Sequence, residues 1–285
     1  MEKRALGKTG LNVSCVAYGG VTSMDETQQD SDRYVAYAIE HGVNYFDVAP
    51  SYGNAQERLG ESLRPYRHDV YLACKTMCRD AEGARRELLH SLQTLHTDYF
   101  DVYQLHAIAS QADVEQAFAA GGAMETMLWA KKEGLIRNIG FSAHDEDAAL
   151  AALDRHDLAT VLFPMNWALA MVRGWGDRIA ALARERGLGL LAIKTLVERQ
   201  WLAGDERTRY PKSWCKPIAG NDALSVAAMK YAVFKGAATQ IPPGNFEHLC
   251  FMLEHMAECL ENPLTDGEWA LLRAEAEKAR DSLIF

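Results

Sequence analysis

The sequence lacks a long hydrophobic run. No apolar stretch approaches the about 18 residues that cross a bilayer, and the first residues lack the apolar segment of a signal peptide. An excess of positive charge is also lacking, since the net charge is -9 at pH 7 and the pI is about 5.5. Nucleic acid and membrane surfaces are therefore not expected as partners, and a cytoplasmic location is expected.

The cysteines lack the spacing of a metal site or a redox pair. There are six, with no Cys-x-x-Cys and no paired zinc pattern. Cys15, Cys74 and Cys250 lie in apolar segments, where cysteine serves as a small core residue. All six are expected to be reduced thiols, and Cys78 and Cys215 are the candidates for a reactive role. No bound metal is expected.

The chain also lacks linkers rich in Pro, Ser or Gly, low-complexity segments and internal repeats. Its 285 residues are 48% hydrophobic, which is enough to bury a large core. The length suits two modest domains or one α/β barrel. Without a linker, one domain over residues 1–285 is the better prediction.

Short segments rich in β-branched and aromatic residues alternate with segments of helical period. The expected strands are 16–18, 45–48, 70–74, 99–105, 136–141, 160–163, 189–193 and 238–241. The expected helices are 31–41, 54–63, 83–95, 124–133, 145–155, 177–186, 223–235, 246–259 and 265–282, the last outside the fold. A small hairpin over 4–14 precedes them.

This alternation predicts an α/β fold, a (β/α)8 TIM barrel with a short N-terminal β-hairpin and an extra C-terminal helix. A doubly wound sheet is the alternative. Its Gly-x-Gly-x-x-Gly phosphate turn is missing after the first strands.

Polar side chains stand at the ends of three neighbouring expected strands. Asp47 and Tyr52 follow the second strand, Lys75 ends the third and His106 ends the fourth. Strand ends and the loops after them share one face of such a barrel, so these four groups should meet. Asp47 can neutralise Lys75, and an ammonium beside Tyr52 would lower the phenol pKa from about 10 toward the working range.

The four residues thus predict a proton donor for a developing alkoxide, with His106 bonding the substrate oxygen. Taken alone, Asp47 could instead cap the next helix and Tyr52 could pack the loop. A metal-dependent lyase or hydrolase is disfavoured, because His106 and Asp47 are too few ligands.

The chain carries four motifs in a fixed order. They are Leu6-Gly7-Lys8-Thr9-Gly10-Leu11, Phe46-Asp47-x-Ala49-x-x-Tyr52-Gly53, Gln104-Leu105-His106 and Ile136-Arg137-x-Ile139-Gly140-x-Ser142. Together they resemble the aldo-keto reductase family over nearly the whole chain. The resemblance implies a TIM barrel in which Tyr52 is the general acid, Lys75 and Asp47 tune its pKa, and His106 orients the carbonyl.

The resemblance also implies a cofactor and a reaction. NADP(H), with NAD(H) possible, would lie extended across the barrel rim and support reversible reduction of an aldehyde or ketone to an alcohol. The partner is a small-molecule carbonyl or alcohol, and the protein a monomer or small homo-oligomer. The implied cofactor contacts are Gly20, Ser142, Asn166, Lys194, Pro242, Gly244 and His248.

On the cofactor side the chain departs from the family pattern. An asparagine that grips the nicotinamide carboxamide commonly follows Ser142, and here His144 stands two residues on. The glutamine that binds the same amide aligns with Leu162, with Asn166 as a substitute. The aromatic residue that stacks on the nicotinamide aligns with Ile193.

The turn at 241–246 lacks the serine and arginine usual in the family. His248 falls where the arginine would contact the 2′-phosphate, and Met252 where an asparagine would meet the adenine. The alternative is that His248 is a solvated helix residue. Losing a bidentate arginine leaves NADP versus NAD open, while backbone amides at the helix start could still hold a phosphate.

The segment 195–222 is long for a structureless loop, which indicates a function. It carries Trp201, Tyr210 and Trp214 together with five cations: Arg199, Arg207, Arg209, Lys212 and Lys216. We hypothesise that it folds over the cofactor or an acidic substrate. The alternative is a surface excursion with its aromatic residues packed on the barrel.

Two points stay open from the sequence. Met24, Trp167 and Phe285 are further pocket candidates whose loops could point elsewhere. A second function, a nucleotide-sensing or partner-binding subunit with weak or no catalysis, is suggested by the altered nicotinamide and phosphate motifs.

Overall fold

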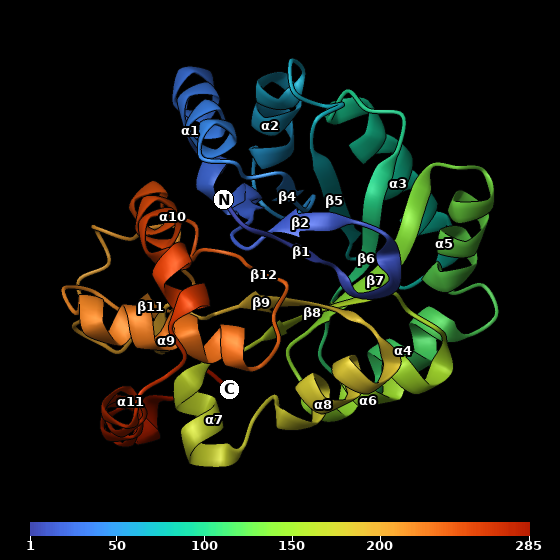
Figure 1. Ribbon diagram of the computed structural model, residues 1–285. Coiled ribbons are helices and arrows are strands. Elements are labelled where there is room, and N and C mark those ends of the chain that lie inside the picture. The colour runs from blue at the N-terminus through green and yellow to red at the C-terminus, as the bar shows by residue number, and fades with distance from the viewer.

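Eight strands pair in parallel in the order in which they follow one another along the chain (Figure 1). The computed structural model describes residues 1–285. The barrel strands are β3 (Tyr18–Gly19), β4 (Tyr45–Asp47), β5 (Tyr71–Thr76), β6 (Phe100–Ile108), β7 (Ile136–Ala143), β8 (Thr160–Pro164), β9 (Gly189–Ile193) and β12 (Thr239–Gln240). The barrel closes where the amide of Gln240 donates to Cys15 O and that of Ala17 to Gln240 O, both at 3.0 Å. The predicted (β/α)8 barrel is confirmed, and the doubly wound alternative is wrong.

Helices follow the strands and surround the barrel (Figure 1). They are α1 (Gln28–Glu40), α2 (Ala55–Leu63), α3 (Ala81–Thr94), α5 (Ala123–Lys132), α6 (Glu146–Arg155), α8 (Asp177–Arg186), α9 (Asp222–Phe234) and α10 (Phe246–Glu261). Each agrees with an expected helix to within three residues at either end. Side-chain caps define several starts: Thr27, Asp80, Asp145 and Asn221 each accept a hydrogen bond from a first-turn amide.

Two helices lie where loops were expected. They are α4 (Gln111–Phe118) and α7 (Trp167–Arg173). Ser110 caps α4 by accepting from the amide of Asp113, and Asn166 caps α7 by accepting from the amide of Leu169. Both are short, so their apolar periodicity is weak in the sequence, and the capping residue is their clearest signal.

The last predicted helix is α11 (Asp266–Lys278), followed by the 3-10 turn η3 (Arg280–Ser282). It packs on α7 and α9 rather than on the barrel strands. A second, smaller hydrophobic core lies between these three helices, beside the main core of the barrel. None of the helices combines the length and hydrophobicity needed to cross a membrane.

The predicted N-terminal hairpin is present as β1 (Lys3–Ala5) and β2 (Asn12–Ser14), joined through the 3-10 turn η1 (Gly7–Thr9). Figure 1 shows it lying across one end of the barrel. The amide of Lys8 donates to Gly187 O at 2.8 Å, and Leu6 is fully buried. Gly7 has a φ of +52°, and a Cβ there would overlap the backbone atoms Leu188 C and Gly189 N, so no side chain fits.

We expect Gly7→Ala to destabilise the protein by about 2–5 kcal/mol, because an overpacked backbone contact adds to a left-handed conformation that disfavours a Cβ. Gly10→Ala is the matched control: its φ is +77°, but no atom lies within 4 Å of the added Cβ. It should cost only about 1–2 kcal/mol. Urea unfolding of both variants measures the difference, and equal losses would show that the hairpin turn is not packed against β9.

Candidate active site

A buried ion pair lies at the carboxyl ends of β4 and β5. The ammonium of Lys75 meets the carboxylate of Asp47, and the two side chains are 1% and 3% exposed. Gln104, on β6, donates to the other carboxylate oxygen at 2.9 Å. Burial lowers the pKa of Lys75, but the charge and hydrogen bond of Asp47, together with Tyr52, raise it by more, so the pKa lies above its ordinary value. The amine is therefore charged at neutral pH.

Tyr52 lies between this pair and the cavity that it lines, with its hydroxyl 3.4 Å from Lys75 Nζ. The sequence predicts that the ammonium lowers the phenol pKa. In the structure, burial raises the pKa of Tyr52; Lys75 opposes the rise without offsetting it, and Asp47 adds to it. The expected direction is wrong because burial of the phenol outweighs the lowering by Lys75, which the charge of Asp47 also weakens. The phenol keeps its proton at neutral pH, which is the form that a proton donor needs.

A bulge in β6 carries His106 into the site. The register between β6 and β7 shifts after Leu105, and Ala107 has a φ of +54°. The bulge is held by hydrogen bonds from Arg79 Nη2 to His106 O and from the Ala107 amide to Ser142 Oγ, both 2.7 Å.

The imidazole of His106 lies edge-on to Tyr52, with ring centroids 5.7 Å apart. Burial, reinforced by the charge of Lys75, lowers the pKa of His106 to about 2. The ring is therefore neutral, and one of its nitrogens carries a proton that it can donate to a substrate oxygen.

A cavity opens beside these groups, and the empty space in it and at its open mouth amounts to about 730 Å³. Seven of the predicted site residues line it: Asp47, Tyr52, His106, Ser142, Lys194, Pro242 and Gly244. Lys75 lies behind the wall, in contact with Asp47 and Tyr52. The structure thus brings together the four predicted catalytic residues and four of the seven predicted cofactor contacts.

Three predicted cofactor residues do not line the cavity. A Cβ on Gly20 would lie 2.8 Å from Val48, so this glycine serves close packing on the loop after β4. The side-chain amide of Asn166 is engaged elsewhere: its Nδ2 donates to the backbone carbonyls of Lys194 and Val197 at 3.0 and 2.8 Å. His248 is buried against Tyr210, not solvated, and burial lowers its pKa to about 4, so it brings no positive charge.

The turn before α10 fits a phosphate. Asn245 precedes the helix but does not cap it, because its side chain donates to Ser213 Oγ at 2.8 Å. The amides of Phe246 and Glu247 are thus left for an anion, while that of His248 donates to Asn245 O at 3.1 Å. Gly244 has a φ of +85°, and a Cβ there would lie 2.6 Å from Val21. The glycine lets the turn approach the rim closely, as a nucleotide cradle requires.

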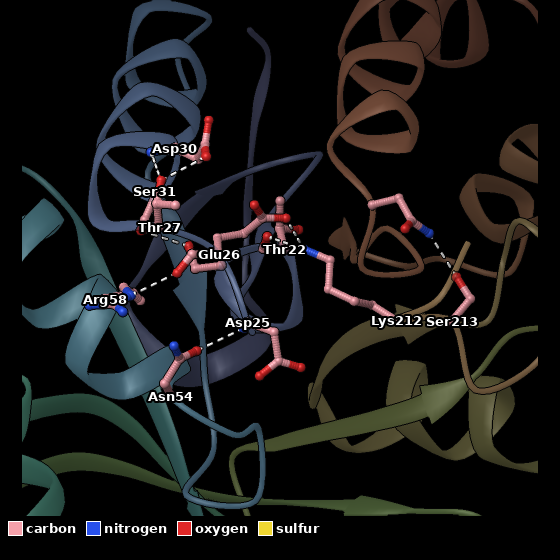
Figure 2. A network of polar contacts seen from close by, with 12 residues as sticks. Thr22, Asp25, Glu26, Thr27, Asp30, Ser31, Asn54, Arg58, Lys212 and Ser213 are labelled. Atoms are coloured by element: carbon pink, nitrogen blue, oxygen red, sulfur yellow. Dashed lines mark hydrogen bonds and ion pairs between the residues drawn. The ribbon is translucent and has the colours of Figure 1, made fainter. Parts of the chain in front are cut away.

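Residues 195–222, which we call the strap, cross the mouth of the cavity. The strap contains the antiparallel strands β10 (Val197–Arg199) and β11 (Lys216–Pro217), so it is not structureless. Figure 2 shows Lys212 reaching from the strap to the loop before α1, where it donates to Thr22 O at 2.7 Å and to Glu26 at 2.6 Å. The strap folds over the site at this contact.

The cations of the strap are largely engaged by carboxylates of the chain. Ion pairs join Arg199 to Asp205, Lys216 to Glu198, Arg209 to Glu247 and Lys212 to Glu26. Arg207 lies over the ring of Trp201 instead. These side chains hold the strap in place, which leaves few of them for an acidic ligand.

Several cavity residues had only weak signals in the sequence. Trp214 and Cys215 come from the strap, and the Trp214 ring lies 5.6 Å from that of Tyr52. His144 also lines the cavity, whereas Cys78 does not. Gln104 had a usable signal, since it stands two residues before His106 and so shares its side of β6.

The other pocket candidates lie outside the cavity lining. Trp167 is fully buried in the core between α7, α9 and α11. Phe285 contacts His144, with ring centroids 5.3 Å apart. Met24 packs beside Gly53. No group of three or more His, Cys, Asp or Glu side chains is placed to hold a metal ion.

Comparison with known proteins identifies the family. Residues 16–232 match the model of the Aldo/keto reductase family. The chain belongs to this family. An uncharacterized oxidoreductase, YqkF, of Bacillus subtilis (strain 168) is 32% identical over 157 residues, which are 50% of this chain and 49% of the relative. The chain spans about half the length of the curated relatives it matches first.

Solved aldo-keto reductases share the fold over nearly the full length. The holo form of one from Bacillus halodurans has a TM-score of 0.73 and 22% identity, covering 99% of this chain and 98% of its own. Another, from Klebsiella pneumoniae in complex with NADPH, has a TM-score of 0.70 and 22% identity, covering 96% and 95%.

We expect Lys75→Met to destabilise the protein by about 3–5 kcal/mol, because the carboxylate of Asp47 would stay buried without its cation. The double variant Asp47→Asn/Lys75→Met removes both charges and should lose much less than the single variant. Urea unfolding of both single variants and the double variant completes the cycle. Additive losses would show that the two groups do not form a coupled pair.

Proposed function

We propose that this protein reduces an aldehyde or ketone to an alcohol with NADPH or NADH, and that Tyr52 is the proton donor. One observation carries the proposal: a protonated phenol lies at the cavity wall 3.4 Å from a buried, charged ammonium and beside a neutral imidazole. Membership of the aldo/keto reductase family supports the reaction class.

Each of the four residues has a separate part. His106 donates a hydrogen bond to the carbonyl oxygen and orients it. Tyr52 donates its proton as negative charge develops on that oxygen. The ammonium of Lys75 stabilises the phenolate that remains, and this is strongest in a site of low dielectric. Asp47 keeps Lys75 charged in spite of its burial.

The cofactor, when bound, supplies the hydride. Ser142, Pro242 and Gly244 line the cavity on the side of β7 and β12, and the free amides at the start of α10 suit a phosphate. The NADPH complex of the reductase from Klebsiella pneumoniae supports this choice of cofactor. His248 is neutral in the structure, so it does not favour the 2′-phosphate of NADP over the hydroxyl of NAD.

A second candidate is a nucleotide-sensing or partner-binding subunit with weak catalysis. It is favoured by the cofactor side, where Asn166 is engaged by backbone carbonyls and His248 is buried. Titrating the tryptophan fluorescence with NADPH and NADH, and assaying a panel of aldehydes, separates the two. Tight binding without turnover would favour the subunit, and binding of neither cofactor would disfavour both.

We expect Tyr52→Phe to lower kcat/KM by about 10²- to 10⁴-fold, because the phenol acts mainly in the transition state. The Kd for NADPH should change little. Tyr45→Phe is a matched control: it removes a hydroxyl on β4, the strand before Tyr52, that is buried without a hydrogen-bond partner. Wild-type turnover in Tyr52→Phe would mean that another group donates the proton.

The two directions of the reaction should differ in pH dependence. The raised pKa of Tyr52 keeps the phenol protonated, so the reduction rate should stay level up to about pH 10. The reverse oxidation needs the phenolate, so its rate should rise with pH over that range. His106, with its pKa lowered to about 2, should add no inflection near neutrality. Steady-state rates in both directions test this; a fall in reduction between about pH 7 and 9 would contradict it.

A further inference from the structure

Lys194 places an ammonium group in the cavity without a carboxylate partner. It follows the end of β9, is half-buried and lines the cavity. Its contacts are Cys215 Sγ at 3.6 Å and the ring of Trp214, whose centroid lies 5.4 Å from Nζ. A thiol is a weak acceptor, so neither contact replaces a counter-ion.

The backbone fixes where Lys194 stands. Its φ is +64°, a left-handed conformation that is costly for a residue with a Cβ. The carbonyl of Lys194 accepts from Asn166 Nδ2 at 3.0 Å and from the amide of Val197 at 3.2 Å. The surrounding structure therefore holds this residue in an unfavourable conformation, which is typical of a functional position.

The remaining charges of the cavity wall are balanced. Asp47 is paired with Lys75, and Lys212 is paired with Glu26. His106 is neutral, since burial lowers its pKa to about 2. The wall thus carries one positive charge in excess, that of Lys194. A partly buried charge of this kind is costly until an ion of opposite sign binds.

His144 gives a second, independent indication of a ligand. It lines the same cavity, and its Nδ1 is buried without a hydrogen-bond partner. Burial, together with the charge of Lys194, lowers the pKa of His144 to about 4, so its ring is neutral and adds no charge of its own to the cavity. A ligand oxyanion in this part of the cavity would neutralise the ammonium and bring a hydrogen-bond acceptor to the neutral imidazole of His144.

We propose that the carbonyl substrate carries a carboxylate, and that Lys194 and His144 bind it. The substrate class is then an oxo acid, with its carboxylate held away from the carbonyl that Tyr52 and His106 engage. This rests on the proposed function. Trp214 contacts both Lys194 and Tyr52, at 5.4 and 5.6 Å, so the ammonium shares a wall with the proton donor. A cofactor phosphate is the other oxyanion that Lys194 could meet.

The test compares 4-carboxybenzaldehyde with 4-methylbenzaldehyde in the wild type, Lys194→Met and Lys194→Arg. Both substituted residues have a Cβ and so keep the unfavourable left-handed backbone of Lys194; only Lys194→Met removes the positive charge. The wild type should prefer the carboxylated aldehyde. Lys194→Met should lower the ratio of the two kcat/KM values by about 10- to 100-fold, and Lys194→Arg should retain most of it. No preference in the wild type, or an unchanged ratio in Lys194→Met, would overturn the proposal.

Two binding arms separate the sources of the anion. Tryptophan fluorescence gives the Kd for NADPH and, with saturating NADP⁺, the Kd for 4-carboxybenzaldehyde. Loss of carboxylate binding in Lys194→Met, restored in Lys194→Arg, supports the proposal. A loss of NADPH affinity as large as the loss for the carboxylate would assign Lys194 to a cofactor phosphate and overturn it. Carboxylate binding that survives Lys194→Met would place the anion at Tyr52 and His106, and also overturn it.

The failure of this inference differs from the failure of the proposed function. If no aldehyde is reduced with either cofactor, the proposed function is wrong, and the carboxylate site is judged by the binding arm alone. If both aldehydes are reduced equally well, the proposed function stands and the carboxylate site is wrong.

Discussion

The ion pair between Lys75 and Asp47 is the interaction on which the rest of the site depends. Its two side chains come from neighbouring barrel strands and are almost fully buried, so neither charge has water to replace its partner. The pairing of β4 with β5 determines that they meet. Tyr52 is held at the edge of this pair, and Gln104 satisfies the second carboxylate oxygen. The barrel can bury these two charges only because each one is paired with the other.

Much of the fold, and the meeting of the four residues of the proposed proton-donor site, could be predicted from the sequence. Strands with apolar residues and polar ends have a local signal, and parallel strands bring their ends to one rim whatever the loops do. Asp47, Lys75 and His106 followed from that rule alone. The roles of Asn166, His248 and Gly20 could not be read in this way, because each depends on which backbone or side chain packs against it.

The strap shows a related limit. A sequence rich in Arg, Lys and Trp suggests contact with an acidic ligand, and the same residues serve equally well to fasten a long segment to acidic neighbours. Two of the carboxylates that engage them, Glu26 and Glu247, are distant in the chain. The direction of the Tyr52 pKa was missed for the same reason, since it depends first on how deeply the phenol is buried and then on the balance between Lys75 and Asp47.

The bulge of β6 couples the position of His106 to the side chain of Ser142 on β7. The hydroxyl of Ser142 lines the cavity, yet it also accepts the hydrogen bond from Ala107 that keeps the bulge in its left-handed conformation. Without that hydroxyl the bulge would lose one of its hydrogen bonds, and the imidazole of His106 would no longer be held in one orientation. A kinetic defect at Ser142 would then resemble the loss of a cofactor contact while its origin was a misaligned histidine one strand away.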